Sequence, residues 1–209
     1  MRKRPQQERS RQMVETLIEA TARTISKRGL DGTTTPLIAE AAGVSVGSLY
    51  QYFDGKEALL VALVEKLAAD IARVLNAQMP VNEAGSLREM TGNSIRLGLA
   101  ILHNDEGLYL ELIRNWHRLP TLRVADILQQ HFLEVSRLFF LKHYRELPIG
   151  NLQVRLFIII NSTLFTLVRL LSQDKSSLLR EEDVVEGLTE MITGYLEGDI
   201  AGRNTDPSH

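Results

Sequence analysis

The feature that most constrains the fold of this 209-residue chain is a 15-residue pattern that begins at Thr35. Four apolar residues fall where two short helices that cross at a tight turn would bury them: Ile38, Ala42, Val44 and Leu49. Ala39 is small enough for the helices to cross closely, and Gly43 can adopt the positive φ that the turn requires. The pattern predicts a helix-turn-helix, although a three-helix corner that binds no DNA would pack in the same way.

The residues after this turn suit a helix that approaches DNA closely. Ser45 is a good N-cap, and Val46, Gly47 and Ser48 are all short. Gly47 costs a helix about 1 kcal/mol relative to alanine, so helix stability does not explain it. The second helix of such a motif presents its N-terminal residues to base edges in the major groove. We therefore expect Gly47 to make room for DNA.

Three larger residues are expected beside the groove. Tyr50 and Tyr52 lie two positions apart, so they point to different sides of a helix. Lys56 falls in the first turn of the next helix, where a cation opposes the macrodipole unless a phosphate lies nearby. The alternatives are a solvated lysine at Lys56 and, because Tyr52 also falls on an apolar position of the motif, a packed ring there.

Positive charge is concentrated at the N-terminus. The net charge is −2, but the first 11 residues hold five basic residues against Glu8 alone. These are Arg2, Lys3, Arg4, Arg9 and Arg11. The rest of the chain is mildly acidic. This basic arm either contacts nucleic acid or is a solvated tail.

Helical periodicity continues through the chain, without strand-like alternation. The predicted helices are 10–28, 35–42, 46–52, a long helix that opens at Asp54 to Lys56, 86–103, 106–117, 121–146, 151–172 and 181–197. The fold class is all-α, with about nine helices: a three-helix helix-turn-helix domain over 1–55 and a larger helical bundle over 56–200. Residues 201–209 are expected to be a flexible tail.

Composition narrows the function. The chain has no cysteine, which excludes disulfides and thiolate metal sites and suits a cytoplasmic location. The N-terminus lacks the apolar stretch of a secretory signal. The longest uncharged segment, 156–168, is too short to span a bilayer, so we expect a helix buried on most sides and no membrane partner.

The segment Thr33–Leu60 resembles the signature of TetR/AcrR-family transcriptional regulators. The resemblance rests on this set: Thr33-Thr34, Ile38-Ala39, Ala42-Gly43-Val44-Ser45, Gly47, Leu49-Tyr50, Tyr52-Phe53, Lys56-Glu57 and Leu59-Leu60. It implies a homodimeric, ligand-responsive protein that binds a palindromic double-stranded operator, usually as a repressor.

The resemblance also implies DNA-contacting roles for individual residues. Phosphate contact or positioning is implied for Thr34, Ser45, Tyr50, Tyr52 and Lys56, and base reading for Val46, Gly47 and Ser48. Thr35, Gln51 and Arg4 complete the predicted DNA-binding set. The chain departs from the pattern at Pro36 and Gln51, where many members carry other polar residues.

The predicted helix at 151–172 is apolar on more than one face. A helix that buries two faces in so small a domain suggests contact with its own core and with a second subunit. The helix at 181–197 would supply the other half of a dimeric four-helix interface, and the resemblance places the dimer contact on the same two helices. The alternative is a monomeric core.

Aromatic and titratable residues suitable for a small-molecule pocket gather in the larger domain. The predicted ligand-binding residues are His103, Tyr109, Arg114, Trp116, His117, Phe139, Phe157 and Asn161. Glu111 and Arg118 fall in the same cluster. Each has an alternative role, as plain core or as a helix end. We predict no catalytic residue, no metal site and no cofactor, because neither a catalytic triad nor a phosphate loop is evident. The alternatives to a ligand-gated repressor are a DNA-binding regulator without a small-molecule effector and, more remotely, a helical enzyme.

Overall fold

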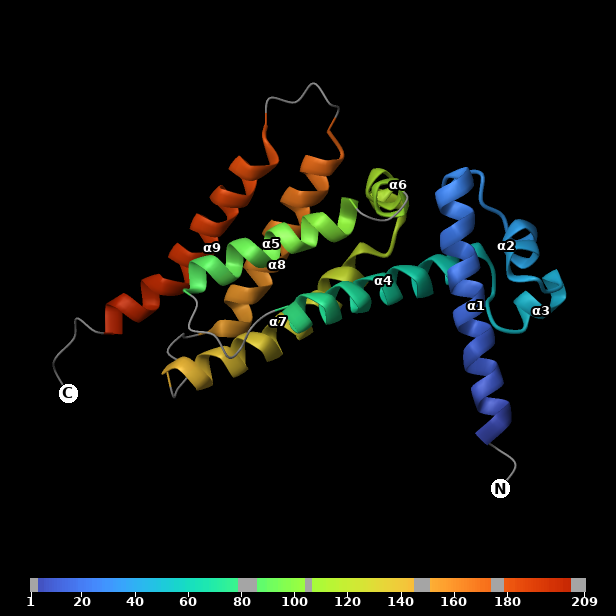
Figure 1. Cartoon of the computed structure of the whole chain (residues 1–209), viewed down its shortest axis with the longest axis horizontal. Helices are drawn as coiled ribbons and strands as arrows, with labels where there is room; N and C mark the ends of the chain where they lie inside the picture. Colours follow the sequence, from blue (N-terminus) through green and yellow to red (C-terminus); the bar gives the residue numbers. More distant parts are fainter. Residues whose placement is uncertain (1–3, 79–85, 104–106, 145–150, 174–178, 204–209) are drawn as a thin grey trace. The chain divides into compact units, whose positions relative to one another are not determined.

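The computed structural model describes residues 4–78, 86–103, 107–144, 151–173 and 179–203, and every regular element in these ranges is a helix (Figure 1). The elements are α1 (Arg4–Arg28), α2 (Thr35–Ala42), α3 (Val46–Tyr50), α4 (Lys56–Gln78), α5 (Leu87–His103), α6 (Leu108–Arg114), the 3-10 helix η1 (Trp116–Arg118), α7 (Thr121–Tyr144), α8 (Leu152–Leu171) and α9 (Glu181–Arg203). The prediction of an all-α fold with an N-terminal helix-turn-helix is confirmed.

The outer helices are longer than the sequence suggested. Helix α1 begins at Arg4 and not at Ser10, because the glutamines and arginines before Ser10 are good helix formers and Pro5 is tolerated in a first turn. Helix α9 continues to Arg203, past the expected end at 197. The predicted tail therefore begins inside a helix, and its remaining residues, 204–209, lie outside the described part of the chain.

Two predicted ends near the turn also shift. Helix α3 ends at Tyr50, because its C-cap Gln51 is followed by a non-helical segment, so Tyr52 lies beyond the helix. The long helix begins at Lys56, and the carbonyl of Gly55 accepts a hydrogen bond from the N–H of Leu59 at 3.3 Å. Gly55, with a φ of 142°, thus holds the N-cap position of α4.

The chain divides into two compact units, which we describe separately. Unit 1 comprises Met1–Leu67 with His103–Thr121, and unit 2 comprises Ala68–Leu102 with Leu122–His209. This structural grouping does not coincide with the functional boundary predicted after residue 55, because α6 and η1 pack in unit 1. That functional boundary stays a prediction.

Unit 1 holds the helix-turn-helix. Its first core cluster takes fully buried residues from four helices: Leu17 and Ala20 of α1, Ile38 and Ala39 of α2, Leu49 of α3 and Leu59 of α4. At the end of α2, Gly43 adopts a φ of 70°, and its N–H bonds to the carbonyl of Glu40 at 3.0 Å. The N–H of Val44 bonds to the carbonyl of Ala39 at 3.0 Å, which completes a Schellman-type ending. The predicted burial is therefore confirmed at Ile38 and Leu49, whereas Ala42 and Val44 are half-buried and pack against the same cluster, and the small Ala39 is buried as the crossing requires.

A second cluster in unit 1 joins helices that are distant in sequence. Ile18 and Ile25 of α1 and Leu60 and Leu63 of α4 pack with Leu108 and Leu112 of α6. Leu30, in the loop between α1 and α2, is buried in the same cluster. Helix α6 is thereby fixed against α1 and α4, next to the helix-turn-helix.

Unit 2 is built around the core of α5, α8 and α9, with α7 packed against it. Its buried residues are Ile95 and Leu99 of α5, Leu152, Leu156, Ile159 and Ile160 of α8, and Val185, Leu188, Ile192 and Leu196 of α9. Ion pairs cross between α5 and α9: Arg96 to Glu182 at 2.5 Å, and Arg88 to Glu186. One face of α8 is thus buried in the core of its own unit.

Candidate nucleic-acid interface

The start of α3 is capped as the sequence predicts. Ser45 has extended backbone angles, and its Oγ accepts a hydrogen bond from the N–H of Ser48 at 3.0 Å. The two serine hydroxyls also lie 2.9 Å apart. Val46 and Gly47, which occupy the turn between them, are exposed. The turn expected to face DNA is therefore ordered by its own cap and open on its outer side.

None of the described residues requires glycine at position 47. A Cβ built there would meet only Ser45 Oγ, at 3.9 Å, which is an ordinary contact. Its φ also lies outside the positive range, so a larger residue would not strain the backbone. The described residues leave room for a side chain here, so the bare first turn of α3 is open to close approach by a partner.

Two tyrosines flank this turn. Tyr50 is 52% exposed and Tyr52 is 37% exposed, so neither ring is fully packed. The hydroxyl of Tyr50 lies 3.4 Å from Oγ1 of Thr35, at the beginning of α2. Thr34 holds the N-cap position of α2, but its hydroxyl makes no capping bond. Hydroxyl groups from the start of α2 and the end of α3 therefore lie on one exposed part of unit 1.

Lys56 lies at the first position of α4 and is half-buried. Its Nζ donates to the backbone carbonyl of Leu30 at 2.5 Å. An ammonium has three donors, so this bond fixes the side chain without using all of its hydrogen-bonding capacity. The predicted phosphate contact of Lys56 stays a prediction, now with a defined anchor.

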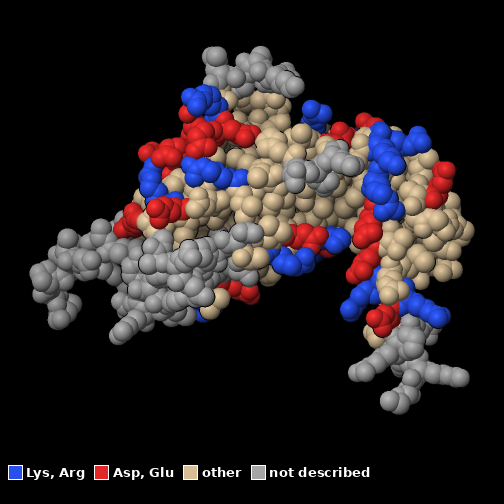
Figure 2. Space-filling view, in the orientation of Figure 1, with Lys and Arg blue, Asp and Glu red and all other residues tan. Residues whose placement is uncertain are grey.

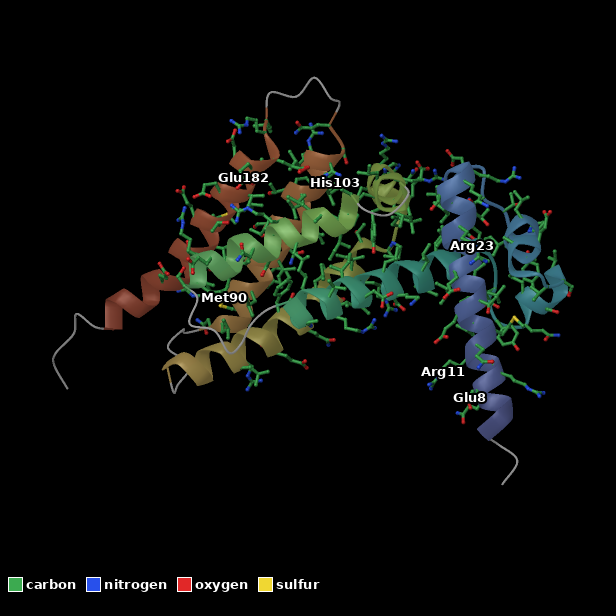
Figure 3. All side chains as sticks on the ribbon, in the orientation of Figure 1. Glu8, Arg11, Arg23, Met90, His103 and Glu182 are labelled. Atoms are coloured by element: carbon green, nitrogen blue, oxygen red, sulfur yellow. The ribbon has the colours of Figure 1, made fainter. Side chains whose placement is uncertain are left out.

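Helix α1 carries bands of charge along its exposed side (Figure 2). Glu8 and Arg11 lie near its start, and Arg23 lies closer to its end (Figure 3). Arg23 donates from Nη2 to the carbonyl of Ala41 at 3.1 Å and so ties α1 to the last turn of α2. The side chain of Arg4 lies outside the described residues.

The structure divides the predicted ligand-binding residues between the two units. His103, Tyr109, Arg114, Trp116 and His117 belong to the 103–121 segment of unit 1. Phe157 and Asn161 lie on α8 in unit 2, and the side chain of Phe139 lies outside the described residues. Phe157 is 55% exposed, and Asn161 Nδ2 donates to the Phe157 carbonyl at 2.8 Å. Exposure of this kind fits a protein contact better than an enclosed pocket.

Sequence reasoning missed the role of Glu111. Its Oε1 accepts from the N–H of Leu30 at 2.8 Å and from Asn115 Nδ2 at 3.2 Å. Glu111 and Leu30 are 81 residues apart, and no local sequence pattern predicts a contact over that distance. A pocket role is therefore an incomplete interpretation of this carboxylate.

Two further properties, metal-binding groups and apolar helices, can be stated for the described residues. No group of three or more His, Cys, Asp or Glu side chains there is placed to hold a metal ion. By length and composition alone, α8 is apolar enough to cross a membrane, and 28% of its most apolar window is buried within the chain. The sequence expectation of a helix buried on most sides is therefore not met within the described part of the chain.

Comparison with known proteins agrees with this geometry. The family model for bacterial regulatory proteins of the tetR family matches residues 17–63, which run from α1 into α4. The chain is 36% identical over 77 residues to the nucleoid occlusion factor SlmA of Haemophilus ducreyi, a match that covers 37% of each protein. It is 43% identical over 61 residues to the HTH-type transcriptional regulator BetI of Brucella canis, over 29% of this chain and 31% of BetI.

The matched segments thus span only about a third of these relatives. A solved structure extends the likeness to the whole fold: RolR in complex with resorcinol aligns with a TM-score of 0.64 over 97% of both chains, at 17% identity. The helix-turn-helix and the matching family model lead to one conclusion: residues 17–63 form a domain of the tetR family of bacterial regulatory proteins, and the fold of the whole chain is shared with RolR.

Proposed function

We propose that this chain is a DNA-binding transcription regulator and not an enzyme, and that it acts in the cytoplasm as a homodimeric repressor released from its operator by a small molecule. The observation that carries DNA binding is the start of α3: a capped, exposed turn with a glycine that the folded chain does not need. A partner that approaches the backbone accounts for all three properties.

In this proposal α3 lies in the major groove with its first turn toward the base edges. The bases are read by Val46, Gly47 and Ser48, and the two ends of the helix are held by Ser45 and Gln51. The sugar–phosphate backbone is contacted by Thr34, Thr35, Tyr50, Tyr52 and Lys56. Contacts to phosphates fix the register and orientation of the protein, whereas contacts to bases select the sequence. The basic arm, Arg4 included, adds sequence-independent attraction.

The exposed faces of α8 and α9 support a dimer. On α8 the large exposed residues recur at helical spacing, opposite the face buried in unit 2: Val154, Phe157, Ile158 and Phe165. On α9 the corresponding stripe holds Met191 and Tyr195 together with Gly187 and Gly194, whose surroundings are open. A second copy of the same two helices would cover both stripes in an isologous interface.

The same face has one other conceivable occupant, a lipid bilayer. The contrast between a buried and an exposed side of α8 favours a protein partner over a lipid bilayer. Leu156, Ile159 and Ile160 bury one side of α8 against α5 and α9, so only the other side needs a partner. A two-fold dimer also accounts for a palindromic operator, whose half-sites lie about 34–36 Å apart.

The effector part of the proposal concerns the larger domain over 56–200. RolR, which has the same fold, was solved with resorcinol bound, and this supports a ligand-gated mechanism here. Ligand binding would favour a subunit arrangement in which the two α3 helices no longer match successive major grooves. Helix α4 belongs to both units and would carry this coupling.

Two alternative functions from the sequence analysis remain. A regulator without a small-molecule effector is one, and the SlmA match gives it weight, because that relative is named for nucleoid occlusion. A helical enzyme is the remote one. The effector claim is tested by screening compounds against the protein bound to its operator. A compound that raises the operator Kd supports gating, and a complete screen without such a compound would leave the first alternative standing.

DNA binding itself is tested with a duplex library of randomised sequence, from which the operator emerges as a result. Selection from this library should enrich a palindrome with half-sites one helical turn apart. Lys56→Ala should then weaken binding and lower the salt slope by about one unit. Arg73→Ala is the matched control, since Arg73 lies 17 residues further along α4, about 25 Å away at 1.5 Å per residue. Failure of the wild-type protein to enrich any sequence would overturn the proposal.

A further inference from the structure

Leu30 lies in the loop between α1 and α2, and charged side chains from two other helices bind both of its backbone groups. Its N–H donates to Glu111 Oε1 of α6 at 2.8 Å, and its carbonyl accepts from Lys56 Nζ of α4 at 2.5 Å. Its own side chain is 1% exposed. One residue thus connects α1, α4 and α6 immediately before the helix-turn-helix.

The bond from Glu111 satisfies an N–H that the ending of α1 leaves without a partner in its own helix. Helix α1 ends at Arg28, and the following Gly29 has a φ of 70° and an N–H bonded to the Ile25 carbonyl at 2.8 Å, the single bond of the αL motif. In a Schellman ending the following N–H returns to the same helix, as that of Val44 does at the end of α2. At the end of α1 the following N–H, that of Leu30, goes to a carboxylate of α6 instead.

The carboxylate is held in place for this contact. Asn115 Nδ2 donates to Glu111 Oε1 at 3.2 Å, and a Cβ at Gly29 would lie only 3.1 Å from the same oxygen. A hydrogen bond to a carboxylate is shorter and stronger than one between neutral groups. The N–H of Leu30 is therefore held from the side of α6, while its carbonyl, which also accepts from the N–H of Thr33 at 3.4 Å, holds the ammonium of Lys56.

We propose that Glu111 is a positioning residue for the DNA-phosphate contact of Lys56 and acts through the backbone of Leu30. The inference rests on the proposed DNA-binding function. A lysine side chain has many rotamers, and binding a phosphate requires one of them. Because the Leu30 carbonyl already selects that rotamer, the free protein bears the ordering cost before DNA arrives.

The test measures how Glu111 and Lys56 depend on each other. Binding of a fluorescein-labelled duplex of mixed sequence is followed by anisotropy from about 50 to 200 mM salt, because phosphate contacts need no operator. Glu111→Ala should weaken binding about fivefold and lower the salt slope toward that of Lys56→Ala. In the Lys56→Ala background, Glu111→Ala should cost less than about twofold more. Glu111→Gln keeps an acceptor for the Leu30 N–H and should bind within about twofold of wild type.

A second measurement needs no DNA. Brief acetylation with acetic anhydride, read by mass spectrometry, reports how accessible each lysine amine is. Glu111→Ala should increase labelling of Lys56 relative to Lys27, which is exposed on α1. Arg73→Ala is again the control, because it removes an ion pair with Asp70 on α4 that shares no partner with Glu111, Lys56 or Leu30. It should change neither the labelling nor the DNA affinity.

The outcomes separate the inference from the function on which it rests. If the wild-type protein binds no duplex at any salt concentration, the proposed function fails and the positioning role fails with it. If the wild type binds but the Glu111 and Lys56 effects are additive, Glu111 has only a structural role and DNA binding stands. Unchanged Lys56 labelling in Glu111→Ala also overturns the positioning role.

Discussion

The exposed faces of α3 and α8 differ in what they offer a partner. The side chains at the start of α3 are short, and two of them carry hydroxyl groups, whereas the outer face of α8 carries two phenylalanines that are more than half exposed. Both helices bury their opposite faces in the core of their own unit. The difference indicates that one surface is shaped for a partner with dense hydrogen-bonding groups and the other for an apolar surface like itself.

The largest expected effect comes from charging the α8 face. Phe157→Glu combined with Phe165→Glu places four carboxylates in a two-fold interface and removes four rings. Burial of one phenylalanine contributes about 1.5–3 kcal/mol, so the dimer Kd should rise at least about a hundredfold. Sedimentation analysis over a range of concentrations measures this change.

Leu122→Glu is the control for that experiment. Leu122 is 78% exposed but lies at the start of α7, outside the proposed face. It should leave the dimer Kd unchanged. A wild-type protein that is monomeric at high concentration, or that partitions into lipid vesicles, would remove the dimer from the proposal.

The next effect separates stability from DNA binding at α3. Gly47→Ala and Gly98→Ala both place a methyl group in open space on a helix, so neither should lower the melting temperature, and each can add up to about 1 kcal/mol of helix stability. Only Gly47→Ala should weaken DNA binding, by roughly tenfold or about 1.4 kcal/mol, because its methyl group would stand between α3 and the bases. Equal DNA affinities for the two variants would mean that α3 does not approach DNA closely.

A smaller effect is expected at the tyrosines. Tyr52→Phe removes one hydroxyl and should weaken binding to all sequences by about two- to tenfold, the net value of one hydrogen bond. The salt slope should stay the same, because no charge is lost. Tyr195→Phe on α9 starts from the same exposed fraction, 37%, and should leave the affinity for duplex DNA of mixed sequence unchanged. A changed slope in Tyr52→Phe would indicate that a neighbouring cation moves with the ring.

The sequence predicted the helix-turn-helix closely because its signals are local. Ile38, Gly43 and Leu49 are set by spacing within one turn and two short helices, and the structure places each as expected. The residue types in 103–121 indicate a ligand pocket, but the packing of this segment depends on Leu30 and on α1, far away in sequence. Contacts over such distances leave no periodic trace, so the role of Glu111 could not be foreseen.

The smallest effect concerns pH and the seam between α5 and α9. The hydrogen bond from Arg96, aided by its positive charge, lowers the pKa of Glu182 in the folded protein. A carboxyl group with a lowered folded pKa contributes stability that is complete above its unfolded pKa, about 4.3, and is lost as pH falls through the folded value.

Glu182→Gln should therefore lower the melting temperature at pH 7, and the difference from wild type should vanish toward pH 3. The difference should be small and should shrink with salt, because both partners are about half exposed. Glu40→Gln, in α2 of unit 1, is the control, because it removes the same charge outside this seam. A difference that grows on acidification would mean that the Arg96 pair does not stabilise unit 2.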